Sequence, residues 1–279
     1  MILNKSLGKK KNVEKQNGKK HGTQNKIING QLVKGDNHPW MVSLGFLGAD
    51  SYFHLCGGSI ISNKHILTAA HCVTDLGNNF NYREYYKKNG NFLVGIVGVK
   101  SLDKNKDVFS LFEYTNMMLI TKITYNTNYT DVENPYDVAV LNINREFAFS
   151  NQVSKINLPL TVNHKIVFGA ASQIAGWGVT EKKTVSIDLL HANVTIISGN
   201  KKLYSDENNY CVLDLTRRKA NICFGDSGGP LVVYQKGIPY VYGVASYVYT
   251  KSDETCNNTS PSYFTMVPKN LEWIKKQLV

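Results

Sequence analysis

Short apolar runs separated by polar clusters constrain the fold of this 279-residue chain more than any other feature. Runs such as "WMVSLGF", "FLVGIVGV", "KITYNT" and "LVVY" have the length of single strands, and clusters of Asn, Gly, Lys and Asp separate them. This spacing is typical of an all-β body, of a size that suits one large or two small lobes. Only "NLEWIKKQLV" differs, because Leu271, Ile274 and Leu278 fall on one helical face and predict a C-terminal helix.

One apolar run follows directly on a glycine-rich segment, "CFGDSGGPLVV", which contains Ser227. Glycine gives up side-chain packing and backbone entropy, so we expect a tight turn or a close approach of another backbone here. The segment also fits the G-x-S-x-G elbow of the α/β-hydrolases, in which the triad order is Ser, acid, His. That interpretation is excluded, because the last histidine of the chain is His191 and none follows Ser227.

A serine nucleophile needs an imidazole to take its proton and an acid to orient that imidazole. "LTAAHC" places His71 after a strand-like run and beside Cys72, and "YDVAVLNI" places Asp137 at the entrance of an apolar run. Taken singly, a histidine is more often structural and an aspartate at a strand entrance is more often a turn residue. Together, in the order His71, Asp137, Ser227, they predict a catalytic set.

Five blocks in this order resemble the trypsin and chymotrypsin family of serine peptidases: "CGGSIISNKHILTAAHC", "YDVAVLNI", "AGWG", "CFGDSGGPLVV" and "PSYFTMV". The resemblance runs from about Ile27 to the C-terminus. It implies two Greek-key β-barrels with the triad between them, His71 as the base, Asp137 as the orienting acid and Ser227 as the nucleophile. It also implies an oxyanion hole made of the backbone N–H groups of Gly225 and Ser227.

The stretch "NKIING" resembles the activation site of this family. Cleavage after Lys26 would place a new ammonium on Ile27, and a buried cation needs a partner. By resemblance that partner is Asp226, which would lock the oxyanion loop. We therefore expect a lysine-rich activation tail over residues 1–26, a peptidase domain over 27–279, and a trypsin-like enzyme as the activator.

The resemblance also assigns the primary specificity pocket. Its floor falls on Asn221, its walls on Val248 and Ser262, and Ser246 supports Asp137. A floor without a carboxylate leaves a bound Arg or Lys side chain unpaired, so strong preference for basic residues is not expected. Valine and serine walls favour small or medium apolar residues, in an elastase-like manner. Since the segment after Val248 is longer than in typical relatives, a chymotrypsin-like pocket stays open as an alternative.

Five cysteines cannot all pair within one chain. By family position Cys56 pairs with Cys72, closing a loop of 16 residues, and Cys223 pairs with Cys256. Such a short closure contributes about 3 kcal/mol in the chain-entropy model. Cys211 is left over: it is either a buried thiol or a bond to another chain. Disulfides indicate an oxidising compartment.

The net charge of +11 lies mostly in the N-terminal tail. Residues 1–26 contain eight lysines and Glu14, a net of +7, which leaves +4 for the remainder. The tail has too few apolar residues to fold and lacks interleaved aromatic residues, so we do not expect nucleic acid as a partner. The tail lysines are Lys5, Lys9, Lys10, Lys11, Lys15, Lys19, Lys20 and Lys26.

Secretion is the expected location, because the predicted disulfides are joined by sequons at Asn4, Asn128, Asn193, Asn257 and Asn258. The stretch "MILNKSLGKKKNVEK" contains no apolar core of a signal peptide, so we expect the true start to be missing or removed. No run approaches the roughly 18 apolar residues of a membrane helix, and no membrane association is expected. His54, His65 and His71 lack zinc-site spacing, so neither metal nor cofactor is expected.

Two functions remain. The first is a monomeric secreted endopeptidase made as a zymogen, with polypeptide substrates, an activating protease and proteinaceous inhibitors as partners. The second is a catalytically silent homologue that acts by binding, as family members lacking a triad residue can. The complete triad, the oxyanion glycine and the activation site favour the enzyme.

Overall fold

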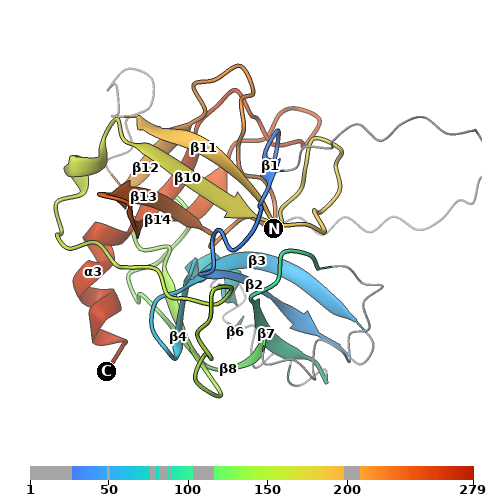
Figure 1. Ribbon diagram of the computed structural model, residues 1–279, viewed down its shortest axis with the longest axis vertical. Coiled ribbons are helices and arrows are strands. Elements are labelled where there is room, and N and C mark those ends of the chain that lie inside the picture. The colour runs from blue at the N-terminus through green and yellow to red at the C-terminus, as the bar shows by residue number, and fades with distance from the viewer. Residues whose placement is uncertain are drawn as a thin grey trace, which may run out of the picture.

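The computed structural model describes residues 27–48, 51–75, 80–81, 87, 90–102, 116–197 and 208–279 (Figure 1). Strands account for most of the regular structure. They are β1 (Gln31–Leu32), β2 (Met41–Leu47), β3 (Tyr52–Ile60), β4 (His65–Thr68), β5 (Thr74–Asp75), β6 (Phe80–Asn81), β7 (Phe92–Val97), β8 (Met117–Tyr125), β9 (Ala139–Ile143), β10 (Ala171–Gly176), β11 (Leu190–Ile197), β12 (Asn209–Leu213), β13 (Pro230–Gln235), β14 (Ile238–Val248) and β15 (Ser262–Met266). The helical elements are η1 (Ala70–Cys72), η2 (His164–Val167) and α3 (Val267–Lys276).

Six antiparallel strands close the first barrel in the order β2, β3, β4, β9, β8, β7. The second barrel follows from a sheet in the order β11, β10, β13, β14, β15, β12, which closes because β11 also pairs with β12. The short strand β1 is added to the outer edge of β11. The two barrels lie one above the other, with the chain crossing between them (Figure 1). The predicted all-β, two-barrel fold is therefore confirmed.

The core of the first barrel depends on two strands whose glycines leave room for a large neighbour. A Cβ at Gly58 would lie 3.0 Å from Ile66 Cγ2, and one at Gly95 would lie 3.1 Å from Ile66 Cδ1. The Ile66 side chain is fully buried and fills this space. Close packing of this kind makes the loss of a few methyl groups costly.

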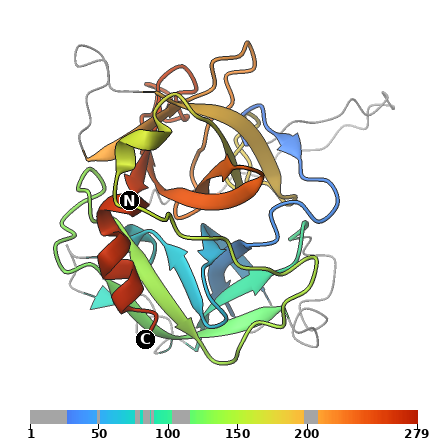
Figure 2. The same ribbon diagram turned by 60° about the vertical axis from the view of Figure 1, so that its left-hand side comes forward.

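The C-terminal helix α3 links the two barrels. It packs against β14 and η2. Leu271 and Ile274 are buried as the sequence pattern predicted and Val267 is buried as well, whereas Leu278 lies beyond the end of the helix and is half-buried. Figure 2 shows α3 running alongside both barrels. Asn270 on α3 donates to Pro135 O at 2.8 Å, so the helix also holds the loop that leads into Asp137.

The predicted tail, residues 1–26, lies outside the described residues. Of the helices described, none is long and apolar enough to cross a membrane.

The Ile66 packing gives a stability prediction. Ile66→Ala should lower the free energy of unfolding by about 2–5 kcal/mol, and Ile66→Val by about 0.5–1.5 kcal/mol, because each leaves a cavity that the glycines cannot fill. Urea unfolding with the disulfides intact measures the difference. The matched control is Leu160→Ala, a side chain that is 80% exposed; an equal loss at both positions would contradict the assignment.

Candidate active site

Neighbouring strands of the first barrel bring His71 and Asp137 together. His71 lies on η1, just after β4, and Asp137 lies just before β9; β4 and β9 pair through Thr68 and Ala139. His71 Nδ1 lies 2.8 Å from Asp137 Oδ2, and the His71 backbone N–H donates to Asp137 Oδ1 at 3.0 Å. Asp137 is fully buried. A buried carboxylate needs such donors, so the pairing holds both side chains in fixed orientations.

A side chain from the second barrel also donates a hydrogen bond to the carboxylate of Asp137. Ser246, on β14, lies with its Oγ 2.5 Å from Asp137 Oδ2 and 2.9 Å from Val132 O. A hydroxyl has one proton, and the charged carboxylate is the stronger acceptor. The predicted support of Asp137 by Ser246 is present in the structure.

The Asp137 charge determines the protonation of His71. Burial lowers the pKa of His71, but the charge of Asp137 and its hydrogen bond raise that pKa by more, so it lies above its ordinary value. Because the carboxylate accepts from Nδ1–H, the neutral ring carries its lone pair on Nε2. The ring is therefore oriented as a base.

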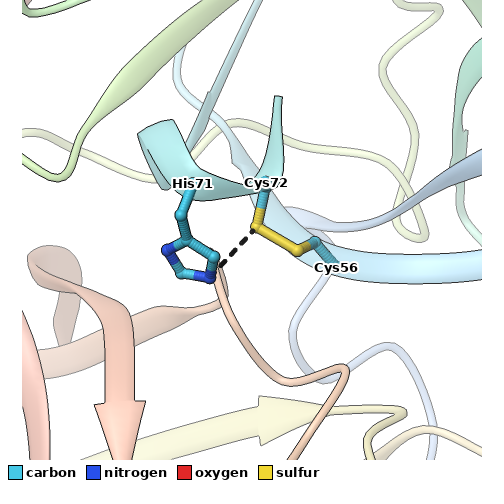
Figure 3. Close-up of side chains that lie close together, drawn as sticks. All are labelled: Cys56, His71 and Cys72. Atoms are coloured by element: carbon cyan, nitrogen blue, oxygen red, sulfur yellow. Dashed lines mark hydrogen bonds between the residues drawn. A yellow bond between two sulfur atoms is a disulfide. The ribbon is translucent and has the colours of Figure 1, made fainter. Parts of the chain in front are cut away.

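The Cys56–Cys72 disulfide lies beside the imidazole of His71 (Figure 3). His71 Nε2 lies 3.9 Å from Cys72 Sγ. The three side chains place ligand-type atoms within 4.8 Å of one another. The two sulfur atoms are bonded to each other, however, and so provide no thiolate for a metal ion.

The Ser227 loop packs against the strands that lead to His71. Gly57 N–H donates to Ser227 O at 2.7 Å, and Gly228 N–H donates to Ala245 O at 2.7 Å. Gly228 has φ +79°, and a Cβ there would approach Thr68 Oγ1 and Gly57 O, the latter to 2.5 Å. The close backbone approach predicted for this glycine is present. It fixes the Ser227 loop against the end of β4, which precedes His71.

Two backbone donors of this loop remain available. Asp226, Gly228 and Gly229 each donate their N–H to a backbone carbonyl. Within the described part of the chain, Gly225 N–H and Ser227 N–H have no such acceptor. Unpaired N–H groups on one rigid turn are suited to an anionic oxygen.

A buried hydrogen-bonded chain, which the sequence did not reveal, fixes the carbonyl of Gly225. His54 Nε2 lies 2.9 Å from Gly225 O, and His54 Nδ1 lies 2.7 Å from Ser43 Oγ, which itself lies 2.7 Å from Tyr52 OH. Burial lowers the pKa of His54 to about 4, so the ring is neutral and donates from Nε2. The sequence signal was slight: a histidine two residues before Cys56.

Asp226 is buried beside the "AGWG" segment. Its carboxylate accepts from Cys223 N–H at 3.0 Å and from Gly178 N–H at 2.8 Å. Burial raises its pKa to about 7 although both donors act in the opposite direction. Ile27 is also fully buried. Among the described residues no hydrogen bond joins Ile27 to Asp226, and Lys26 lies outside them.

The residues predicted to form the specificity pocket lie together. Asn221 is buried, and its amide nitrogen donates to Asn257 O at 3.2 Å and to Ser260 O at 3.0 Å. Val248 pairs directly with Ser262 across β14 and β15. Val248 also packs against the cluster formed by Ile28, Cys223 and Cys256.

Both disulfides implied by the resemblance are present, Cys56–Cys72 and Cys223–Cys256. Cys211 is buried and forms no disulfide.

Comparisons with known proteins agree with this arrangement. The Trypsin family model matches residues 27–274. The chain is 29% identical over 268 residues to CLIP domain-containing serine protease B4 of Anopheles gambiae, covering 91% of this chain and 70% of that protein. It is 26% identical to ovochymase of Halocynthia roretzi, matching 90% of this chain but only 15% of the ovochymase.

Solved structures of human heparin binding protein mutants have the same fold. One superposes with a TM-score of 0.70 and 26% identity, covering 90% of this chain and 96% of that one. Another has a TM-score of 0.69 and 25% identity, with coverages of 89% and 95%. Two closed barrels that hold a histidine paired with a buried aspartate define a trypsin-like protein. Since the family model covers most of the chain, the protein belongs to the trypsin family.

The His71–Asp137 geometry predicts a titration. In the full chain carrying Ser227→Ala, the imidazole of His71 should titrate above pH 6.5, and Asp137→Asn should move its pKa below 6.5, because burial then acts unopposed. NMR of the imidazole protons measures both values. Glu146→Gln, at an exposed acid paired with Lys64, is the control and should leave the titration unchanged. An unchanged pKa in Asp137→Asn would contradict the pairing.

Proposed function

We propose that this protein is a serine endopeptidase made as a zymogen, and that Ser227 forms its acyl-enzyme. The observation that carries the proposal is the buried carboxylate of Asp137, which holds His71 with a basic Nε2. The end of the strand that precedes His71 packs against the glycine loop that contains Ser227. Membership of the trypsin family and similarity to a serine protease over 91% of the chain support it.

In the proposed reaction Ser227 Oγ attacks the carbonyl carbon of a peptide bond while His71 Nε2 takes the hydroxyl proton. The tetrahedral intermediate collapses, the C–N bond breaks, and His71 returns that proton to the departing amine. Water then attacks the ester, again with His71 as base, and releases the acid and Ser227. Asp137 stays ionised and stabilises the imidazolium formed in each half-reaction.

The carbonyl oxygen becomes negative in both intermediates, so the site needs donors that are already in place. Gly225 N–H and Ser227 N–H are the candidates, because neither donates to a backbone carbonyl among the described residues. The His54–Gly225 hydrogen bond helps to hold this turn in position. In the proposed mechanism His54 is a positioning residue and does not exchange protons.

We propose that cleavage after Lys26 completes the site by giving Asp226 a cationic partner on Ile27. In the uncut chain the pKa of Asp226 is raised to about 7. A raised carboxyl pKa contributes stability at low pH that is lost as pH rises through about 7, on the order of 4 kcal/mol for this shift. A new ammonium would offset that loss, which favours insertion of the new N-terminus beside Asp226 after cleavage.

Substrate preference in this proposal follows from the pocket residues. Asn221 uses its amide N–H groups on two loop carbonyls and offers no carboxylate to a basic side chain. Val248 and Ser262, which pair across β14 and β15, are the proposed walls. Small or medium apolar residues before the cut are the expected substrates, and efficient self-activation at Lys26 is not expected.

The alternative is a catalytically silent homologue that acts by binding. An extracellular location is proposed under both hypotheses. Two disulfides support that location, since they persist in oxidising compartments. The structural neighbours are named for heparin binding, and that property belongs to those proteins. The intact His71–Asp137 pair favours the enzyme.

Activation can be tested with a fluorophosphonate probe. Limited cleavage after Lys26 should convert a chain that labels weakly into one that labels at Ser227, and Ser227→Ala should abolish labelling. In the cut chain Asp226→Asn should slow labelling by about 100-fold or more, the scale of a lost oxyanion contact. No labelling of the cut wild type would overturn the proposal in favour of the silent homologue.

Specificity can be tested with peptides that differ only in the residue before the cut. The activated enzyme should turn over Ala and Val substrates fastest. Val248→Gly should raise kcat/KM for Phe relative to Ala by about 10-fold or more, because removing a few methyl groups widens the pocket. Val162→Gly, at a half-exposed side chain, is the control. Fastest turnover after Arg would refute the floor assignment, and fastest turnover of Phe or Tyr by the wild type would refute the walls.

A further inference from the structure

The N-terminal segment, residues 27–38, is attached to the second barrel along β11. Gln31 and Leu32 of β1 pair with His191 and Leu190. Val33 N–H adds a hydrogen bond to Leu189 O at 3.0 Å. Beyond this segment the chain is fixed to the first barrel, where Trp40 O accepts from Ile60 N–H. At its start, Ile28 O accepts from Asn221 N–H at 3.2 Å, and the Asn29 amide donates to Arg218 O at 2.6 Å. The segment is therefore a short strap that is held at both ends and lies along β11 between them.

Two histidines join the strap to β11. His38 Nε2 lies 3.2 Å from His191 Nδ1, and His38 is only 2% exposed. His38 Nδ1 is buried and has no hydrogen-bond partner. If His38 donates from Nε2, its Nδ1 is an unpaired acceptor; if His191 donates, His38 Nδ1–H is an unpaired donor. Neither neutral arrangement satisfies every nitrogen, and protonation of both rings would turn the Nε2 and Nδ1 that face each other into two opposed N–H donors.

The backbone of His38 has an unusual conformation. Its φ is +58°, in the left-handed region that side chains other than glycine rarely adopt. His38 therefore gains backbone freedom when the strap is released.

The charges around the pair oppose further protonation. Lys100 donates from Nζ to Asn37 O at 2.6 Å, next to His38, and Asp36 is the acid that acts on Lys100. Asp188 lies close by, since its backbone bridges to Ser101. Burial, then His191, then Lys100 lower the pKa of His38 to about 3. Burial alone lowers the pKa of His191, which is half-exposed.

We propose that His38 and His191 form an acid-sensitive latch, in which protonation of the pair releases the N-terminal segment from β11. The direction follows from the lowered pKa values. A histidine whose pKa is depressed when docked stabilises the docked state above its free pKa of about 6.5, and this stabilisation is lost as pH falls below that value.

The steepness of release reports how many protons are taken up. Each proton bound only by the released strap changes the docking equilibrium by about 10-fold per pH unit, so two histidines give up to about 100-fold. The pKa of His38 in the docked strap sets the lower limit of this range, because docked His38 itself protonates near pH 3. The latch therefore operates between about pH 6.5 and pH 3.

Release from β11 frees the chain that follows Ile27, so we expect the seating of Ile27 to weaken even though Ile28 O stays paired with Asn221 N–H. This consequence for activity rests on the proposed function. The latch itself does not, because docking of the strap can be measured in a chain that has no nucleophile.

Hydrogen–deuterium exchange on the full chain carrying Ser227→Ala tests the latch. Exchange is followed from pH 7.5 to pH 4.5, with labelling times scaled to keep intrinsic exchange constant. Peptides within residues 28–36 report the strap, and peptides of β2 serve as the internal reference. His191→Gln removes one proton site, and His164→Gln, a histidine on η2, is the matched control.

In the parent chain and in His164→Gln, opening of residues 28–36 should increase by more than about 10-fold per pH unit below pH 6, while β2 stays protected. In His191→Gln the increase should not exceed about 10-fold per unit. His38→Asn removes the other proton site with a residue that tolerates the left-handed φ of +58°. It should likewise limit the increase to about 10-fold per unit, which keeps the test valid if His191→Gln folds poorly. A strap whose opening is independent of pH, or equally steep in all variants, would overturn the proposal.

Discussion

The buried carboxylate of Asp137 is the interaction on which this structure depends. Its oxygens accept from the side chain and backbone of His71 on the first barrel and from Ser246 on the second. Removing any one of these donors would leave the buried charge short of a hydrogen bond, at a cost of about 1.5–3 kcal/mol. The carboxylate thus fixes how the two barrels meet as well as how the imidazole is oriented.

The parts of the molecule that follow from local sequence could be predicted. Short apolar runs indicate the strands, and the apolar face of Leu271 and Ile274 indicates the helix. The order of the triad residues along the chain is enough to exclude an α/β-hydrolase elbow. The two disulfides were implied by the resemblance and are confirmed. Roles of Ser227, Gly225 and Ile27 stay predictions, as do secretion and the tail over residues 1–26.

Other features arise from contacts between distant segments and have no local signature. His54 reaches Gly225 across 171 positions, and His38 reaches His191 across 153. Nothing in "NHPW" or "FHLC" indicates which histidine will be buried or what it will meet. The resemblance implied that Asn221, two residues before Cys223, lies at the floor of the pocket. Its two carbonyl partners could not be predicted, because they depend on the path of the loop after β14.

That loop has a consequence for how specificity could diverge in this protein. Asn221 ties its amide to Asn257 O and Ser260 O, so the floor of the pocket and the loop share one set of hydrogen bonds. An aspartate at this position would set a carboxylate against two carbonyl oxygens and remove both donors. A change of preference toward basic substrates would therefore require the loop to change together with the floor. The substitution of Asn221 by aspartate alone would not be enough.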